Sequence, residues 1–285
     1  MQQEKAFTAS PSELATLYKQ SRQFLTQYQG SIDDETWFGL LQQHFYLSLL
    51  SSHDNDASLM LGRITDRFSE KTGRVALMKS QYIEATEGPQ AAIKYLESRP
   101  DNDLLSLKRK ASFSKFNGNF KEYIDKLLEI ADIIPTDSEL WAELGEAYFA
   151  SGQFLQAIHA YQEVILLTPH AYNIFARIAE IYHTLVVRNP NYNFVDKLEY
   201  LRLSVQHYLR AVELCPVYVR GWAGVQIVSQ KILTLSESSS KLQADDKKKY
   251  TELAEFAERK LLYIVSEKKA TPDNLAAANA ILGEY

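Results

Sequence analysis

The stretch Trp141-Ala-Glu-Leu144-Gly145-Glu-Ala-Tyr148 decides the fold of this chain. Its large side chains are spaced by three and four residues, so Trp141, Leu144 and Tyr148 lie on one face of a helix. Gly145 would let a partner helix approach closely. Gly152, just beyond the stretch, can adopt the left-handed conformation that ends a helix. The stretch therefore predicts the first helix of an antiparallel pair.

The residues that follow predict the second helix of the pair. Phe154, Ala157 and Tyr161 continue the helical spacing, and Pro169 stops it. The small Ala157 suits the point where the two helices cross, and Tyr161 fills the gap beside it. These spacings are the signature of a tetratricopeptide repeat. The signature consists of tryptophan, leucine-glycine and tyrosine on the first helix, followed by alanine, an aromatic residue and proline on the second.

The same landmarks recur with the period of that repeat. Pro135 and Pro169 are 34 residues apart, and so are Gly118 and Gly152. A further tryptophan, Trp222, follows a proline by six residues, as the one quoted above does. Four units in phase predict an all-α fold, a right-handed α-solenoid of tetratricopeptide-like helix pairs.

The periodic part occupies the middle of the chain. We expect an N-terminal extension, a solenoid whose most regular repeats lie at about 104–230, and a C-terminal tail with a short helix. These parts cover residues 1–30, 31–265 and 266–285 in that order. The ends of a solenoid need a polar outer face, and either end could act as a cap.

Two segments depart from the period. Residues 188–200 contain a 13-residue insertion relative to the preceding repeat, and residues 236–249 form a polar stretch that reads as a mobile loop. Insertions in solenoids map to loops and often mark a contact face. The plainer alternative is a tolerated surface loop with no partner.

Composition limits the classes of function. The chain has 285 residues, 46% of them hydrophobic, and a net charge of −5, which disfavours a nucleic-acid or anionic-lipid surface as the main binding mode. Cys215 is the single cysteine, so no intrachain disulfide can form and a reducing compartment is expected. We expect neither a membrane span nor a signal peptide, because the apolar runs are short.

No pattern predicts catalysis, a cofactor or a metal. The six histidines lack the H-E-x-x-H spacing, and neither a glycine-rich phosphate loop nor a G-x-S-x-G turn occurs. A zinc site built from His183, His207 and Cys215 is conceivable, but ordinary packing between helices is by far the better explanation of these residues. We therefore expect a binding protein and not an enzyme.

Features of a particular family occur in order along the chain. They are Asp33-Asp-x-x-Trp37, Ala57 to Phe68 followed by Arg74-Val75, Leu107-Lys-Arg-Lys-Ala111 with Gly118, Glu139-Leu-Trp-Ala-Glu-Leu144 with Glu146 and Tyr148, Pro169-His-x-Tyr172, and Tyr208-x-x-Ala211-Val-Glu-Leu214. In this order, and in its irregularities, the chain resembles the family of subunit 2 of the endoplasmic reticulum membrane protein complex. The resemblance covers roughly residues 30–265.

The resemblance implies a function that spacing alone does not give. It implies a non-catalytic cytosolic scaffold on the endoplasmic reticulum membrane, peripheral through its partners. The partners it implies are the other subunits of a hetero-oligomeric complex, both membrane-embedded and soluble. It also implies that the complex inserts transmembrane segments of tail-anchored and multipass proteins.

A co-chaperone adaptor that binds the C-terminal peptides of heat-shock proteins remains an alternative. Such adaptors hold a terminal carboxylate with Lys, Asn and Arg on their inner helices, and Lys108 and Arg177 could serve. Ser112 and Glu143, however, stand where these adaptors resemble one another in using Asn. The carboxylate of Glu143 would repel the ligand.

Candidate contact residues come from the first helix of each pair, which usually lines the concave side. Those outside the core stripe are polar or charged, the basic ones coming first along the chain. They are Lys108, Arg109, Lys115, Glu143, Glu146, Arg177, Glu180 and His183. We expect them to bind partners; the alternative is that they only keep the surface soluble.

Overall fold

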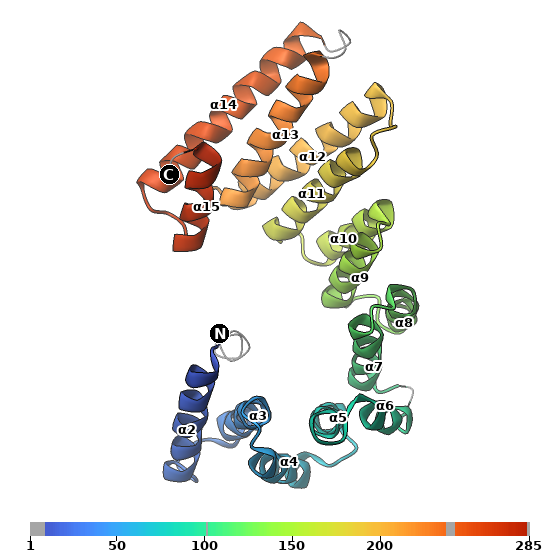
Figure 1. Cartoon of the computed structure of the whole chain (residues 1–285), viewed down its shortest axis with the longest axis vertical. Helices are drawn as coiled ribbons and strands as arrows, with labels where there is room; N and C mark the ends of the chain where they lie inside the picture. The colour runs from blue at the N-terminus through green and yellow to red at the C-terminus, as the bar shows by residue number, and fades with distance from the viewer. Residues whose placement is uncertain (1–8, 101, 238–242, 284–285) are drawn as a thin grey trace. The chain divides into compact units, whose positions relative to one another are not determined.

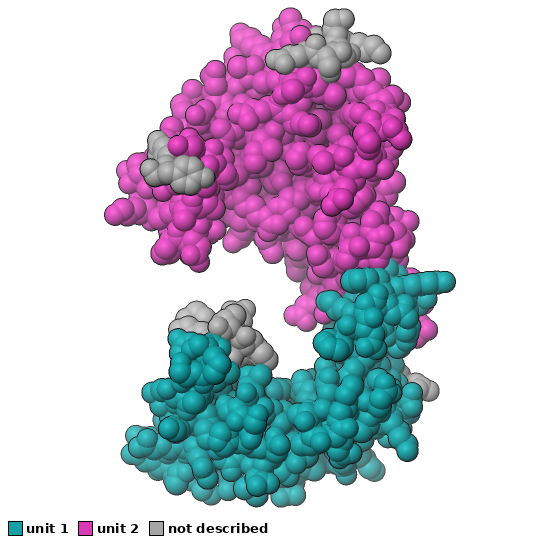
Figure 2. Space-filling model, viewed as in Figure 1, with its two compact units in different colours: residues 1–126 teal, residues 127–285 magenta. Residues whose placement is uncertain are grey.

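The computed structural model describes residues 9–100, 102–237 and 243–283, and the regular structure in these ranges is helical throughout. The chain divides into two compact units, Met1–Lys126 and Leu127–Tyr285 (Figure 2). The boundary falls inside helix α8, Phe120–Ile133. The predicted all-α fold of tetratricopeptide-like helix pairs is confirmed.

Unit 1 begins with a helix inside the predicted N-terminal extension and continues with helix pairs (Figure 1). Its helices are α2 (Pro11–Gln27), α3 (Asp34–Leu50), α4 (Asp54–Phe68), α5 (Gly73–Glu87), α6 (Pro89–Glu97) and α7 (Leu104–Phe116). Helix α3 packs on α4, α5 packs on α6 and on α7, and α2 packs on α3. The division of the chain into extension, solenoid and tail stays a prediction.

The acidic run at the start of α3 caps that helix, as its sequence indicates. A side-chain oxygen of Asp33 accepts a hydrogen bond of 2.9 Å from the backbone N–H of Thr36. Leu41 and Phe45 of α3 pack with Ile64 of α4 in the hydrophobic core between the two helices. The polar run His53-Asp-Asn-Asp56 predicts a turn from the sequence alone, but α4 begins at Asp54, so most of the run is helical.

A buried ion pair fixes the start of α7. The guanidinium of Arg99 lies 2.9 Å from the carboxylate of Asp103 and also donates to the backbone carbonyls of Glu70 and Lys71. Asp103 caps the helix and accepts from the hydroxyl of Ser106 at 2.8 Å. Burial would raise the pKa of Asp103, but the hydrogen bonds from Ser106 and Arg99 outweigh it, and the pKa lies below its usual value.

Unit 2 stacks three helix pairs and ends in a single helix (Figure 1). After the C-terminal part of α8, its helices are α9 (Ser138–Ala150), α10 (Phe154–Leu167), α11 (Tyr172–Arg188), α12 (Phe194–Leu214), α13 (Val219–Glu237), α14 (Ala244–Ser266) and α15 (Pro272–Leu282). Consecutive helices from α9 to α15 are in contact, and α15 also packs on α13. The last short helix starts at the expected Thr271-Pro272.

The signature residues act as predicted. A Cβ added at Gly145 would lie 2.7 Å from the ring of Tyr161 on α10, so only glycine permits this helix approach. Gly152 has φ of 76°, and Gly118, one period earlier, has φ of 74°, which is the left-handed region. Asp137 caps α9 by accepting the backbone N–H groups of Glu139 and Leu140 at 3.0 and 3.2 Å.

The structure explains why tryptophan follows proline by six residues. The indole N–H of Trp141 donates to the carbonyl of Pro135 at 2.8 Å, and Trp222 donates to Pro216 at the same distance. The bond ties the helix to the end of the preceding repeat. Trp141 itself is only half-buried, whereas Trp222 is 6% exposed. The size of Trp141 and its place in the apolar stripe predict a deeply buried side chain; that prediction is wrong, and Trp222 has that role instead.

The 13-residue insertion does not form the loop that we expected. Compared with α9 and α10 (13 and 14 residues), α11 and α12 have 17 and 21 residues, which accounts for 4 + 7 of the insertion. The remaining 2 residues lengthen the connection, 189–193 in place of 151–153. The added residues lengthen the two helices because they continue the apolar spacing, and Leu185, Val186 and Leu201 are buried.

The polar stretch 236–249 is also more helical than expected. Helix α13 continues to Glu237, and α14 begins at Ala244 with two acidic residues in its first turn. The middle of the stretch, 238–242, lies outside the described residues.

Candidate functional site

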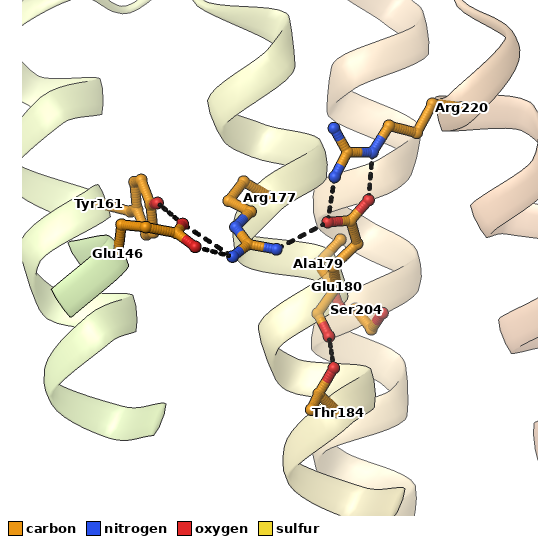
Figure 3. A network of polar contacts seen from close by, with 8 residues as sticks. All are labelled: Glu146, Tyr161, Arg177, Ala179, Glu180, Thr184, Ser204 and Arg220. Carbon is orange, nitrogen blue, oxygen red and sulfur yellow. Dashed lines mark hydrogen bonds and ion pairs between the residues drawn. The ribbon is translucent and has the colours of Figure 1, made fainter. Parts of the chain in front are cut away.

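A chain of paired charges crosses the first helices of the three repeats in unit 2 (Figure 3). Arg177 of α11 holds both carboxylate oxygens of Glu146 on α9, at 3.0 and 2.8 Å. Its other terminal nitrogen lies 3.3 Å from Glu180, one turn further along α11. Arg220 on α13 donates from its Nε and from one terminal nitrogen to the two carboxylate oxygens of Glu180. We call these four residues, Glu146, Arg177, Glu180 and Arg220, the charge ladder.

The inner members of the charge ladder are held firmly. The guanidinium of Arg177 lies over the ring of Phe149, 4.2 Å from its centroid. The hydroxyl of Tyr161 donates to Glu146 at 3.0 Å. Burial, with a contribution from the Glu146 carboxylate, raises the pKa of Tyr161 to about 12, so the phenol stays a neutral donor.

The two ends of the charge ladder are open to solvent. The side chains of Arg177 and Glu180 are 21% and 22% exposed, but those of Glu146 and Arg220 are 50% and 53% exposed. The ladder therefore presents a carboxylate at one end and a guanidinium at the other, held at a fixed separation by the inner pair. This arrangement can bind a basic and an acidic group of another protein; it has no nucleophile and no general base positioned for catalysis.

Backbone contacts fix α11, which carries the centre of the ladder. The hydroxyl of Ser204 on α12 donates to the carbonyl of Ala179 at 2.7 Å, and this serine is completely buried (Figure 3). Thr184 donates to the carbonyl of Glu180 within α11. Because two helices hold the segment, the ladder geometry depends on the packing of α11 against α12.

His183 lies one turn beyond Glu180 on α11 and is half-buried. Burial, and then the charge of Lys231 on α13, lowers its pKa below the usual range, so it is neutral at pH 7. His207 is stacked on Tyr182 at 5.7 Å between ring centroids. In the part of the chain that the structure describes, no group of three or more His, Cys, Asp or Glu side chains is placed to hold a metal ion.

The basic candidates lie on α7 in unit 1. Arg109 is paired with Glu84 of α5, and its guanidinium lies 4.7 Å from the centroid of the Phe113 ring. Lys115 is exposed, with its ammonium 5.4 Å from the centroid of the Tyr123 ring. Lys108 is half-buried on the same helix.

The candidates therefore form two separate groups. Lys108, Arg109 and Lys115 belong to α7 of unit 1, and Glu143, Glu146, Arg177, Glu180 and His183 belong to α9 and α11 of unit 2. In unit 2 the structure joins three of them directly. Glu143 is exposed on α9 and is not part of the charge ladder.

The sequence analysis missed Arg220 and Glu84, which complete these pairs. Arg220 lies two residues before Trp222, on the solvent side of a first helix. Extending the selection of inner-face residues to the repeat that begins after Pro216 would have found it. Glu84 lies in the less regular N-terminal part, where the period gives no such guide.

Comparison with known proteins identifies the family. Residues 58–195 match the family model of the EMC2 TPR-like repeat domain. The TPR repeat protein oca3 of Schizosaccharomyces pombe is 32% identical over 236 residues, which cover 81% of this chain and 79% of that protein. The chain belongs to the EMC2 family of tetratricopeptide-repeat proteins. The resemblance drawn from the sequence is thereby confirmed.

Further comparisons agree with EMC2 family membership. The ER membrane protein complex subunit 2 of Saccharomyces cerevisiae is 27% identical over 241 residues, 80% of this chain and 82% of that protein. The crystal structure of the C-terminal part of a TPR repeat-containing protein of Cytophaga hutchinsonii covers 94% of this chain, and the chain covers 98% of it, with a TM-score of 0.55 and 12% identity. That likeness supports the repeat fold alone. These matches indicate a repeat protein and no enzyme family.

One physical property bears on membrane association. Within residues 9–100, 102–237 and 243–283, no helix has both the length and the apolar character that crossing a bilayer requires.

Proposed function

We propose that this chain is a non-catalytic scaffold subunit of the endoplasmic reticulum membrane protein complex. In this role it lies on the cytosolic side and organises membrane and soluble subunits for the insertion of transmembrane segments. The observation that carries the proposal is its relationship, over 80% of its length, to a yeast protein named as subunit 2 of that complex. The described residues contribute a binding surface, and the work of the protein is to position others.

The charge ladder gives this role a physical basis. A scaffold must hold the spacing between its repeats constant, because each partner is placed by the repeat that it touches. Arg177 bridges two repeats and Arg220 joins the third, so the three first helices are linked by ion pairs. The inner pairs fix the spacing, and the open ends, Glu146 and Arg220, meet the partners.

The remaining candidates form a second proposed contact surface, on α7 of unit 1. Lys108, Arg109 and Lys115 supply positive charge there, while the unit 2 surface has both signs. Such surfaces steer encounter and select partners more than they add affinity. In the proposal, the basic residues of α7 and the charge ladder of unit 2 each bind a different subunit.

The adaptor alternative is weakened by the position of Arg177. An adaptor would need this guanidinium to hold a terminal carboxylate of its ligand. Arg177 is already engaged by Glu146 and Glu180, and it is only a fifth exposed. A carboxylate ligand would have to displace two internal carboxylates, which would remain nearby and repel it.

Purification in mild detergent tests the proposal. The tagged chain, expressed in cells, should co-purify with a multi-subunit endoplasmic reticulum assembly in stoichiometric amounts, as measured by quantitative mass spectrometry. Recovery of heat-shock proteins alone would favour the adaptor and overturn the scaffold role.

A pair of variants tests the surface within the same experiment. Arg220→Glu reverses the open end of the charge ladder and should reduce recovery of the assembly several-fold. Arg210→Glu is the matched control, because Arg210 is similarly exposed but lies on the second helix α12, paired with Glu213 of its own helix. Equal recovery with both variants would exclude the ladder from partner binding.

A further inference from the structure

Helix α7 has a charge that contrasts with the rest of the chain. It carries four basic side chains and no acidic one, in a protein of net charge −5; they are Lys108, Arg109, Lys110 and Lys115. A basic residue in the last turn stabilises a helix through its dipole, but this accounts for Lys115 only. Glu84 of α5 neutralises Arg109, so the local balance stays positive.

The same helix exposes two large apolar side chains. Phe116 is 88% exposed and Leu105 is 40% exposed. They are 11 residues apart, which is close to three helical turns, so they lie within about 20° of each other around the axis and about 16 Å apart along it. Of the buried side chains of α7, Ala111 and Ser114 lie on the other side of the helix, whereas Phe113 lies beside the exposed pair, under the guanidinium of Arg109. Exposed apolar residues framed by charge are typical of a protein contact.

The pairing of Arg109 is incomplete. It donates to Glu84, and to the hydroxyl of Ser112 at 3.3 Å, but its ε N–H is enclosed and has no acceptor among the described residues. Enclosed donors without a partner are uncommon in folded proteins. The Arg109 side chain as a whole is 19% exposed, so a carboxylate of a partner can approach the side chain but not its enclosed ε N–H.

We propose that one face of α7 binds an acidic segment of a protein partner that carries two apolar side chains about 16 Å apart. The α7 face consists of Leu105, Lys108, Arg109, Ser112, Lys115 and Phe116. The apolar side chains of the partner cover Leu105 and Phe116, and its carboxylates meet the cations between and beside them. The inference rests on the scaffold role proposed above and specifies the chemistry of one partner.

Charge complementarity favours an acidic protein segment over an anionic membrane surface. Glu84 lies beside the α7 face, paired with Arg109, and its side chain is about a third exposed. A flat anionic bilayer pressed onto the face would also meet this carboxylate. A single acidic segment is narrower than a bilayer surface. Its carboxylates can contact the basic side chains while the segment stays away from the carboxylate of Glu84.

Photo-crosslinking of the full chain in cells tests the proposal. Phe116 is replaced by the photo-reactive p-benzoylphenylalanine, and Leu166, 74% exposed on α10, is replaced in the same way as the control position. After irradiation and denaturing purification, mass spectrometry identifies the crosslinked peptides. We expect position 116 to capture a segment of net negative charge with apolar residues, at a yield at least fivefold above position 166.

A second variant separates surface chemistry from folding. Lys115→Glu combined with Phe116→Ser should reduce recovery of the partner identified by crosslinking at least fivefold, with an unchanged far-ultraviolet circular dichroism spectrum. Leu166→Ser should leave recovery unchanged. Because Phe116 is almost fully exposed, its replacement does not disturb a core.

Each outcome of these experiments supports or overturns the α7 proposal, the scaffold role or both. Crosslinking to lipid, to a basic or neutral segment, or at the same yield as the control position would overturn the α7 proposal. Unchanged recovery with the double variant would do the same. If position 116 captures an acidic segment of a protein outside the endoplasmic reticulum complex, the α7 face is supported while the proposed scaffold role fails. If the complex co-purifies but position 116 captures nothing above the control, the scaffold role is supported and the α7 proposal fails.

Discussion

Replacing Arg177 by methionine is the sharpest test of the charge ladder. Methionine keeps the apolar stem of the side chain and removes the guanidinium. The lost contacts are the hydrogen bonds from one terminal nitrogen to both carboxylate oxygens of Glu146, the 3.3 Å contact with Glu180 and the stacking on Phe149. A charge-assisted pair of this partial exposure contributes about 1–1.5 kcal/mol, the longer contact about 0.5 kcal/mol and the stacking about 0.5–1 kcal/mol. Arg177→Met should therefore lower the free energy of unfolding by about 2–3 kcal/mol.

A double-mutant cycle isolates the contribution of each pair. Urea unfolding is followed by far-ultraviolet circular dichroism for Arg177→Met, for Glu146→Gln and for the double variant. The coupling energy between Arg177 and Glu146 should be about 1 kcal/mol. The cycle with Glu180→Gln should give about half of that, because Arg220 still holds Glu180 when Arg177 is removed.

Arg210→Met provides the control, since Arg210 is exposed, pairs with Glu213 of the same helix and lies 6.0 Å from the centroid of the Phe175 ring, farther than Arg177 lies from Phe149. Its replacement should cost less than about 0.5 kcal/mol. The reasoning fails if the coupling between Arg177 and Glu146 is below about 0.3 kcal/mol, the usual limit of additivity for independent sites. It also fails if Arg210→Met destabilises the chain as much as Arg177→Met.

Three further predictions follow from the packing and the pKa shifts. Gly145→Ala should destabilise the chain by about 1–3 kcal/mol, because the added Cβ clashes at the helix crossing. Gly39→Ala should stabilise the chain by about 0.5–1 kcal/mol, because Gly39 has open space around it. Thermal unfolding of both variants measures the difference. Trp222→Ala should cost about 3–5 kcal/mol and Trp141→Ala about half as much, because only Trp222 is fully buried; equal costs in urea titrations would contradict the difference in burial. The pKa of Asp103 is lowered in the folded chain, so its carboxylate stabilises the fold fully above the unfolded pKa of about 3.9. This stabilisation is lost as the pH falls from there through the folded pKa. Asp103→Asn should therefore destabilise unit 1 at pH 7, and progressively less as the pH is lowered below about 4. A pH-independent effect in urea unfolding would show that the charge of Asp103 does not contribute.

The fold could be predicted from the sequence because its core residues repeat. Tryptophan after proline, Gly145 against an aromatic ring and glycine at the helix end each impose a local geometry that does not depend on distant residues. Where the period was clear, the helix boundaries agreed closely with the structure. The prediction was poorer where the period was broken, as in the insertion, because a gap in the spacing does not show whether the added residues extend a helix or leave it.

The candidate site was only partly predictable for a different reason. Glu146, Arg177 and Glu180 were selected by their position on first helices, but a position on a helix does not tell which charges pair. Pairing depends on the angle and distance between successive repeats, which the sequence does not specify directly. Arg220 was missed because the selection stopped one repeat short, although Arg220 pairs with Glu180 from the next first helix.

The way in which the repeats differ explains why a ladder forms in unit 2. Glu143 and Arg177 are 34 residues apart, and so are Glu146 and Glu180, so each pair occupies one position in successive repeats. One position stays acidic, while the other changes from glutamate to arginine. The arginine of the later repeat then lies between the constant acids, one on the previous helix and one on its own. Two identical repeats would place only carboxylates at these positions, and their mutual repulsion would oppose stacking. The sign change at position 177 therefore replaces a repulsion between successive first helices by an attraction, and Arg220 continues the alternation of charge on α13.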